Sequence, residues 1–213
     1  MEKLDDFQRD SLGELINMGM GLAASKLSQL TDAEVTMSVP HVDLVTVKQY
    51  LETIATQEDD ESLVSVSESF TGGFTGDAVL IFYFNKSMNL VQSLMPSIEG
   101  MEELEDAVDD FGELEEEVLT EVGNILINSC ISTFANVLKK EFHTDIPRFN
   151  KGTADQILKI PAGTDENEYL ILLAEVDFSV QSKSISGHVA LTLTLPVLRT
   201  LLNDLYKVFG IAV

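Results

Sequence analysis

The chain has one cysteine and few basic residues. Cys130 cannot form an internal disulfide, and it lies in the apolar stretch 125–134, so we expect it to be a small core residue. Lys and Arg number 13 against 36 Asp and Glu, which gives a formal net charge of −23. A protein that binds nucleic acid needs a basic stripe to neutralise phosphates. The composition therefore excludes nucleic acid as a partner.

Long hydrophobic runs are also missing. No stretch of about 18 apolar residues occurs, and the N-terminus MEKLDDFQRD has no apolar segment of a signal peptide. The sequence thus predicts neither a membrane span nor secretion, and a cytoplasmic location is expected. With 213 residues, of which 45% are apolar, the chain can bury a sizeable core.

The sequence matches itself when it is shifted by 107 residues. The shift needs no gap across five identities, which are Glu14 with Glu121, Asn17 with Asn124, Ser25 with Ser132, Glu34 with Glu141 and Pro40 with Pro147. It also sets 63–70 over 170–177, and a further four-residue insertion aligns 76–85 with 187–196. This pattern indicates an internal duplication.

Each half contains the same order of elements. Apolar residues recur every three or four positions in 12–30 and again in 119–137, which predicts a long helix in each half. Strands are predicted at 34–39, 42–47, 63–70, 78–84, 143–146, 168–180 and 185–195, and closing helices near 86–95 and 196–207. Asn85 is a plausible N-cap for the first closing helix, and Pro196 suits the first turn of the second.

This order predicts an α+β fold of two halves related by a pseudo-two-fold axis, in which the sheets join and the helices cover them. We expect a single domain over 1–213, with repeat 1 at about 5–100 and repeat 2 at about 113–213. An acidic connector at about 101–112 links them, within the segment Glu102–Glu117 where ten of sixteen residues are acidic. We interpret this acidic segment as a solvated linker helix, or alternatively as a surface that attracts a basic partner electrostatically. A duplicated chain can have two-fold symmetry as a monomer.

A polar stripe runs along each long helix. At about 100° per residue, Asp10, Glu14, Asn17 and Gly21 share one face opposite the apolar face, and so do Glu117, Glu121, Asn124 and Asn128. We therefore expect both stripes to face solvent. Asn is a mediocre helix former, so its presence in mid-helix in both halves favours a function over simple solvation. Pro40 and Pro147 are interpreted as backbone features that end a short strand.

The repeated motif resembles that of the CheC family of chemotaxis phosphatases. The family pattern is Asp or Ser, three residues, Glu, two residues, Asn and then Pro after twenty-two residues. The first copy (Asp10, Glu14, Asn17, Pro40) matches fully, whereas the second (Glu117, Glu121, Asn124, Pro147) has Glu in place of Asp or Ser. The resemblance covers nearly the whole chain and is closest to a stand-alone CheC, without the rotor domain of flagellar switch relatives.

The resemblance implies hydrolysis of the aspartyl phosphate of a CheY-type response regulator. In that reading Asn17 and Asn124 orient the attacking water, while Glu14 and Glu121 dock the receiver domain by pairing with the lysine beside its phosphate. No cofactor or metal of the protein's own is expected, because metal-site motifs are missing and His41, His143 and His188 lie far apart in sequence. Mg²⁺ is expected on the substrate.

Two other hypotheses stay open. The protein could be a non-catalytic adaptor that binds a regulator or a partner of the CheD deamidase type. Alternatively, the duplicated domain could be purely structural, which requires the polar stripes to be buried or paired within the fold.

Overall fold

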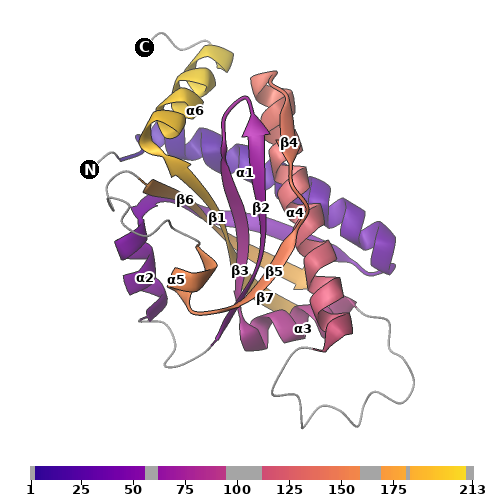
Figure 1. The fold of residues 1–213 in the computed structure, drawn as a ribbon. Coiled ribbons are helices and arrows are strands. Elements are labelled where there is room, and N and C mark those ends of the chain that lie inside the picture. The colour runs from indigo at the N-terminus through magenta and orange to yellow at the C-terminus, as the bar shows by residue number, and fades with distance from the viewer. Residues whose placement is uncertain (1–2, 56–61, 95–111, 159–168, 181–182, 210–213) are drawn as a thin grey trace.

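A computed structural model describes residues 3–55, 62–94, 112–158, 169–180 and 183–209. Within them, six helices accompany one antiparallel sheet of seven strands, which confirms the predicted α+β class (Figure 1). The first half contains α1 (Asp6–Thr31), β1 (Val35–Thr46), α2 (Val47–Ala55), β2 (Leu63–Gly72), β3 (Gly76–Tyr83) and α3 (Phe84–Leu94). The second contains α4 (Glu113–Leu138), β4 (Phe142–Thr144), β5 (Arg148–Gly152), α5 (Ala154–Ile157), β6 (Tyr169–Val180), β7 (Lys183–Thr194) and α6 (Leu195–Val208).

The long helices α1 and α4 have 26 residues each, and their bounds repeat with the 107-residue offset seen in the sequence. Both end at a residue with φ 53°, Asp32 after α1 and Lys139 after α4, which places the same left-handed turn at the end of each helix. A capping box of Asp5 and Gln8 begins α1. The two helices are therefore equivalent elements of a repeated unit.

The acidic segment contributes the beginning of α4. Three of its glutamates, Glu113, Glu115 and Glu116, lie in the first helical turn, where the helix dipole favours negative charge. Leu114, one of its apolar residues, is exposed. The predicted connector at 101–112 lies almost wholly outside the described residues, so its linker role stays a prediction.

The sheet interlocks the two halves. Its strand order is β1-β6-β7-β3-β2-β4, and β5 also pairs with β2. In the duplication, β1 corresponds to β4 and β5, β2 to β6, and β3 to β7. If each strand is replaced by its counterpart, the same strand order is obtained when it is read from the other edge of the sheet. The strands that follow each long helix pair with a strand of the other half. β1 pairs with β6, whereas β4 and β5 both pair with β2. Neither half completes its sheet alone.

The prolines lie differently from the prediction. Pro40 does not end a strand, since β1 continues to Thr46 and unites the strands predicted at 34–39 and 42–47. The register of β1 against β6 shifts between Ser38 and His41, so the irregularity accommodates the missing N–H of an edge-strand proline. In the second half Pro147 separates β4 from β5. The sequence analysis missed β5 because its residues, RFNKG, lack an apolar alternation.

The two faces of the sheet carry separate cores. The larger core lies between the sheet and α1, α4, α3 and α6, and the smaller one lies under α2 and α5 on the opposite face (Figure 1). Neighbouring residues of β3 alternate between them, with Leu80 in the larger core and Val79 in the smaller. The helices α2 and α5 were not predicted, yet they begin 107 residues apart.

The second hairpin follows a slightly different offset from the long helices. Val66 in β2 pairs with Leu80, whereas the equivalent pair in the second half is Leu172 with Leu191. The strands β2 and β6 therefore correspond with an offset of 106, one less than the predicted alignment of 63–70 with 170–177. A shift by one residue turns every side chain to the other face of a sheet, so the burial pattern decides the register.

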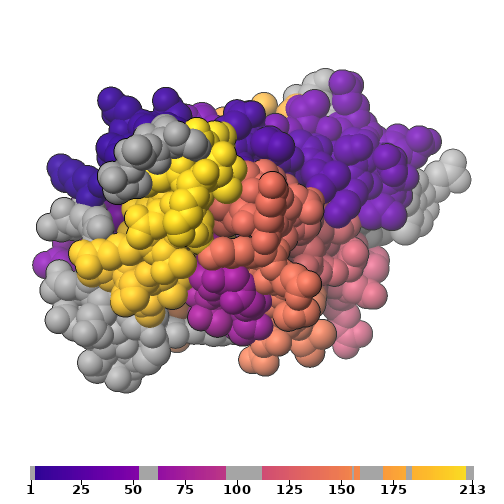
Figure 2. Space-filling view, turned by 90° about the horizontal axis from the view of Figure 1, so that it is seen from above, coloured from indigo at the N-terminus to yellow at the C-terminus, as the bar shows by residue number. Residues whose placement is uncertain are grey.

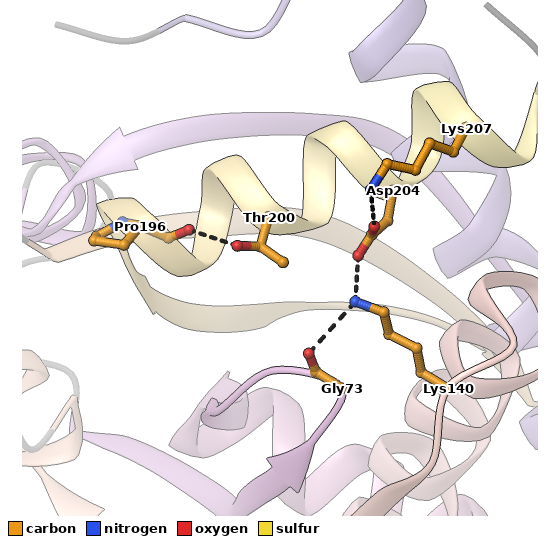
Figure 3. A network of polar contacts seen from close by, with 6 residues as sticks. All are labelled: Gly73, Lys140, Pro196, Thr200, Asp204 and Lys207. Carbon is orange, nitrogen blue, oxygen red and sulfur yellow. Dashed lines mark hydrogen bonds and ion pairs between the residues drawn. The ribbon is translucent and has the colours of Figure 1, made fainter.

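The closing helices are confirmed near their predicted bounds, with one correction. Asn85 is not an N-cap, because α3 already begins at Phe84, whereas Pro196 does lie in the first turn of α6. A polar network secures α6 (Figure 3): Lys140, after α4, contacts the carboxylate of Asp204 and reaches the carbonyl oxygen of Gly73 at 3.5 Å. Lys207 Nζ lies 3.2 Å from the same carboxylate. This network links α6, the end of α4 and the β2–β3 turn.

Of the described helices, α4 is long and apolar enough to span a membrane by length and composition, although 56% of its most apolar window is buried in the fold. It packs closely on the sheet, because a Cβ at Gly123 would lie 2.4 Å from Val66 Cβ. A Cβ at Gly19 of α1 would likewise lie 2.8 Å from Cys130 Cα. The apolar residues of α4 are therefore explained by its packing against α1 and the sheet.

Candidate functional site

The first polar stripe lies on the outer face of α1. Asp10, Glu14 and Asn17 are all exposed, while Leu12 and Ile16 between them are fully buried. Within the described part of the chain, neither Glu14 nor Asn17 makes a hydrogen bond or ion pair. The predicted exposure is confirmed, and both polar groups are available to a partner.

The backbone beneath this stripe is set by β1. A Cβ at Gly13 would lie 3.7 Å from Val42 Cγ2, so α1 packs on β1 just after Pro40. Pro40 itself is exposed beside the register shift. Arg9 Nη2 lies 3.7 Å from Asp43 Oδ1 and connects the first turns of α1 to the same strand. The contacts between α1 and β1 thus begin just after Pro40, whose own supporting role stays a prediction.

The second stripe lies on α4 and is more enclosed. Glu117 and Glu121 are exposed, but Asn124 and Asn128 are half-buried. Asn124 Nδ2 donates to Glu121 Oε2 at 3.4 Å, and Asn124 Oδ1 accepts from Asn128 Nδ2 at 2.6 Å. The second carboxamide is therefore held by neighbours, whereas the first is free. The expectation that both stripes face solvent therefore holds for the two glutamates of the second stripe and only in part for its asparagines.

A buried glutamate lies behind the second stripe. Glu68 of β2 is 1% exposed, and its Oε2 accepts from Asn128 Nδ2 at 3.1 Å. Thr144 of β4 donates to Asn128 Oδ1 at 2.9 Å and completes the cluster. Burial raises the pKa of Glu68 to about 7, against the opposing effect of its polar contacts with Asn128 and Thr144, and the nearby charge of Glu121 raises it further.

The sequence analysis included Asn128 in the second stripe but missed Glu68 and Thr144. The alternation of β2 did contain a signal, because Glu68 shares its face with Val64, Val66 and Phe70, which are all buried. A charged residue on the core face of a strand requires a polar partner. That partner comes from a helix 60 residues away in the chain.

The two stripes lie on adjacent helices. Besides the close approach of Gly19 to Cys130, Lys26 Nζ of α1 donates to Ser129 Oγ of α4 at 3.2 Å. The space-filling view shows α1 and α4 side by side at the surface, with α6 next to them (Figure 2). One face of the protein therefore presents both long helices.

Metal-binding side chains do not gather in the part of the chain that the structure describes: no group of three or more His, Cys, Asp or Glu residues is arranged to hold an ion there. Two histidines that are distant in sequence do become neighbours in the sheet, since His41 and His188 both pair with Glu175 from either side. Burial is the main cause that lowers the pKa of His188. This row lies in the sheet, apart from the two stripes on α1 and α4.

Comparison with known proteins agrees with the motif. A model of the CheC-like family matches residues 7–43, the segment that contains the whole first motif. The chain is 26% identical over 142 residues to the CheY-P phosphatase CheC of Bacillus subtilis, covering 66% of this chain and 64% of that protein. It is 22% identical over 211 residues to the flagellar motor switch phosphatase FliY of the same organism, covering 96% of this chain but 52% of FliY. The alignments thus span about half to two thirds of these relatives.

Solved structures share the fold. Thermotoga maritima FliY superposes with a TM-score of 0.71 at 20% identity, covering 97% of this chain and 98% of that one. The FliM middle domain from H. pylori gives a TM-score of 0.62 at 13% identity, covering 94% of this chain and 99% of that one. The chain is thus similar to the CheC-like family at its first motif and shares its fold with FliY and the FliM middle domain.

Proposed function

We propose that this protein hydrolyses the aspartyl phosphate of a CheY-type response regulator in the cytoplasm, using the stripes on α1 and α4. One observation carries the proposal: an exposed glutamate lies one turn from an asparagine on both long helices, and these helices lie side by side at the surface (Figure 2). The similarity to CheC of Bacillus subtilis, which is named as a CheY-P phosphatase, supports the substrate class.

The chemistry required of such a protein is modest. An aspartyl phosphate is an activated acyl phosphate, and the receiver domain itself holds the Mg²⁺ that neutralises the phosphoryl oxygens. Water attacks phosphorus, the bond to the aspartate oxygen breaks, and inorganic phosphate and a free carboxylate result. What a second protein can add is a water in line with the breaking bond. A carboxamide offers a donor and an acceptor for that purpose and removes no proton.

In this proposal Asn17 and Asn124 orient the water, and Glu14 and Glu121 hold the receiver domain by pairing with a lysine beside the phosphate. The exposure of both glutamates allows such pairing without rearrangement of α1 or α4. Each glutamate contributes to docking, so neutralising it should raise KM more than it lowers kcat. Screening by salt should weaken docking in the same way.

The test is the decay of a phosphorylated receiver domain in the presence of the wild type, Asn17→Ala, Asn124→Ala and the double variant. Asn136→Ala is a matched control, because Asn136 is an exposed asparagine of α4 outside the stripe. We expect each single variant to lose part of the activity, the double variant to lose nearly all of it, and the control to lose none. Unchanged decay with the double variant would contradict the proposal.

The same assay separates the adaptor hypothesis. Binding of the receiver domain, or of a CheD-type partner, without any change in the half-life of the acyl phosphate would favour an adaptor. The presence of an asparagine beside each glutamate, exposed at Asn17 and half-buried at Asn124, favours catalysis, because docking alone requires only the glutamates.

A further inference from the structure

We propose that Glu68 is a positioning residue of the second site, which fixes the orientation of the Asn124 carboxamide through Asn128 and makes hydrolysis at this site depend on its own ionisation. This inference rests on the proposed function and assigns a distinct regulation to one of its two sites. It derives from the cluster that the buried Glu68 forms with the half-buried Asn128, Thr144 and Asn124.

The donors and acceptors around Asn128 determine the orientation of its side-chain amide. A carboxylate only accepts hydrogen bonds, so ionised Glu68 requires the NH₂ group of Asn128 to face it, at 3.1 Å. Thr144 Oγ1 donates to the other end of the amide, Asn128 Oδ1, at 2.9 Å. The second N–H of Asn128 is then left for Asn124, whose Oδ1 lies 2.6 Å and whose backbone oxygen lies 3.0 Å from Asn128 Nδ2.

Asn124 is oriented in turn. Its Oδ1 is occupied by Asn128, and its Nδ2 is left on the side of Glu121, 3.4 Å from that carboxylate. The Asn124 carboxamide is therefore held at its oxygen by Asn128, with its NH₂ group beside the exposed Glu121. Pre-organisation of this kind favours a single position for a bound water.

Protonation of Glu68 removes the constraint. A neutral carboxyl can donate as well as accept, so it can bond to the Oδ1 of a flipped Asn128. The flipped amide would present its oxygen to Asn124 Oδ1, two acceptors would face one another, and Asn124 would lose its orientation. The ionised form of Glu68 is thus the form that supports hydrolysis at the second site.

The charges around Glu68 are few. From α4 it is faced by neutral Asn128 and by the field of Glu121, from β4 by Thr144, and its ladder partner in β3 is Ala78. Asp77, Asp145 and Arg148 line a small cavity on the opposite face of the sheet. Because burial raises the pKa of Glu68 to about 7, its ionisation changes within the physiological range.

Of the cluster, the first site has a counterpart of Asn124 alone, which is Asn17. Gly21 takes the position of Asn128 and faces open space, and Met37 takes the position of Thr144. By the pairing of the hairpins, Ala174 of β6 takes the position of Glu68 and is fully buried. The first site therefore serves as an internal control in the same protein, acting on the same substrate.

The experiment compares two single-site proteins. Asn17→Ala leaves the second site, and Asn124→Ala leaves the first. For each, kcat for hydrolysis of the phosphorylated receiver is measured from pH 6 to pH 8.5. The ratio of the two profiles cancels the titration of the substrate. We expect this ratio of second-site to first-site kcat to rise about tenfold between pH 6 and pH 8.

Two further changes test the route through Asn128. Glu68→Gln offers Asn128 both a donor and an acceptor, as protonated Glu68 does, but it does not titrate, so it should hold second-site activity at its low-pH level and make the ratio independent of pH. Thr144→Val removes the bond that sets the amide and should lower second-site kcat by about tenfold without altering KM. A ratio that stays flat in the wild type, or that still rises with Glu68→Gln, would overturn the proposal.

A measurement without substrate separates this inference from the proposed function. The side-chain NH₂ signals of Asn124 and Asn128 in ¹⁵N spectra should shift together with a midpoint near pH 7 in the wild type and stay constant with Glu68→Gln. If neither site hydrolyses the phosphate, the proposed function fails whatever these signals do. If both sites are active and the signals do not titrate, only the present inference fails.

Discussion

Ionisation of Glu68 should reduce the stability of the fold in a way that one substitution can isolate. The unperturbed pKa of its carboxyl is 4.5, and burial in the folded protein raises it to about 7. A raised acid pKa means that the folded state binds the proton more tightly than the unfolded chain. The resulting stabilisation is fully present below about pH 4.5 and is lost as the pH rises through 7.

The magnitude follows from the two pKa values. One pKa unit corresponds to about 1.4 kcal/mol, so the free energy of unfolding should fall by about 3 kcal/mol from this group between pH 5 and pH 8. Glu68→Gln lacks the titrating group. As the pH rises from 5 to 8, the free energy of unfolding of the variant should therefore increase relative to that of the wild type by about 3 kcal/mol.

Urea denaturation followed by circular dichroism, at pH 5, 6, 7 and 8, measures this difference. Glu117→Gln is the matched control, because it removes one exposed charge from the same region of a chain with a net charge of −23. Its difference from the wild type should change much less over the same range. A Glu68→Gln difference that stays constant within about 0.5 kcal/mol would refute the linkage argument.

Three other predictions concern packing and the polar network. Gly19→Ala should destabilise the fold by about 1–3 kcal/mol, because the new Cβ would lie 2.8 Å from Cys130 Cα. Gly21→Ala on the same helix places its Cβ in open space and should stabilise the fold by up to about 1 kcal/mol. Urea denaturation midpoints measure both effects. Cys130 should not react with a thiol reagent until urea unfolds the protein, because burial raises its pKa to about 12. Asp204→Asn should destabilise by about 1–3 kcal/mol at pH 7. The pKa of Asp204 is lowered despite burial, by hydrogen bonds from Lys140 and Lys207, so this difference should shrink as the pH falls below about 3.8.

The local features of this protein follow from its sequence. Apolar spacing predicts α1 and α4, the 107-residue repeat makes them equivalent, and the helical period assigns Glu14 and Asn17 to an exposed face. Each of these depends on residues within a few turns of one helix, where the geometry of an α-helix is fixed. The element bounds that were wrong, such as the end of β1 at Pro40, depend on a partner strand from the other half.

The tertiary structure alone decided how the two sites differ. The sequence presents two nearly identical motifs, and by itself it determined their positions and their polarity. Only the fold brings Glu68 of β2 and Thr144 of β4 beneath Asn128, because interlocked pairing of the two halves sets the strand neighbours of α4. A buried carboxyl acquires its pKa from desolvation and from contacts distant in sequence, and neither is encoded in the spacing of a motif.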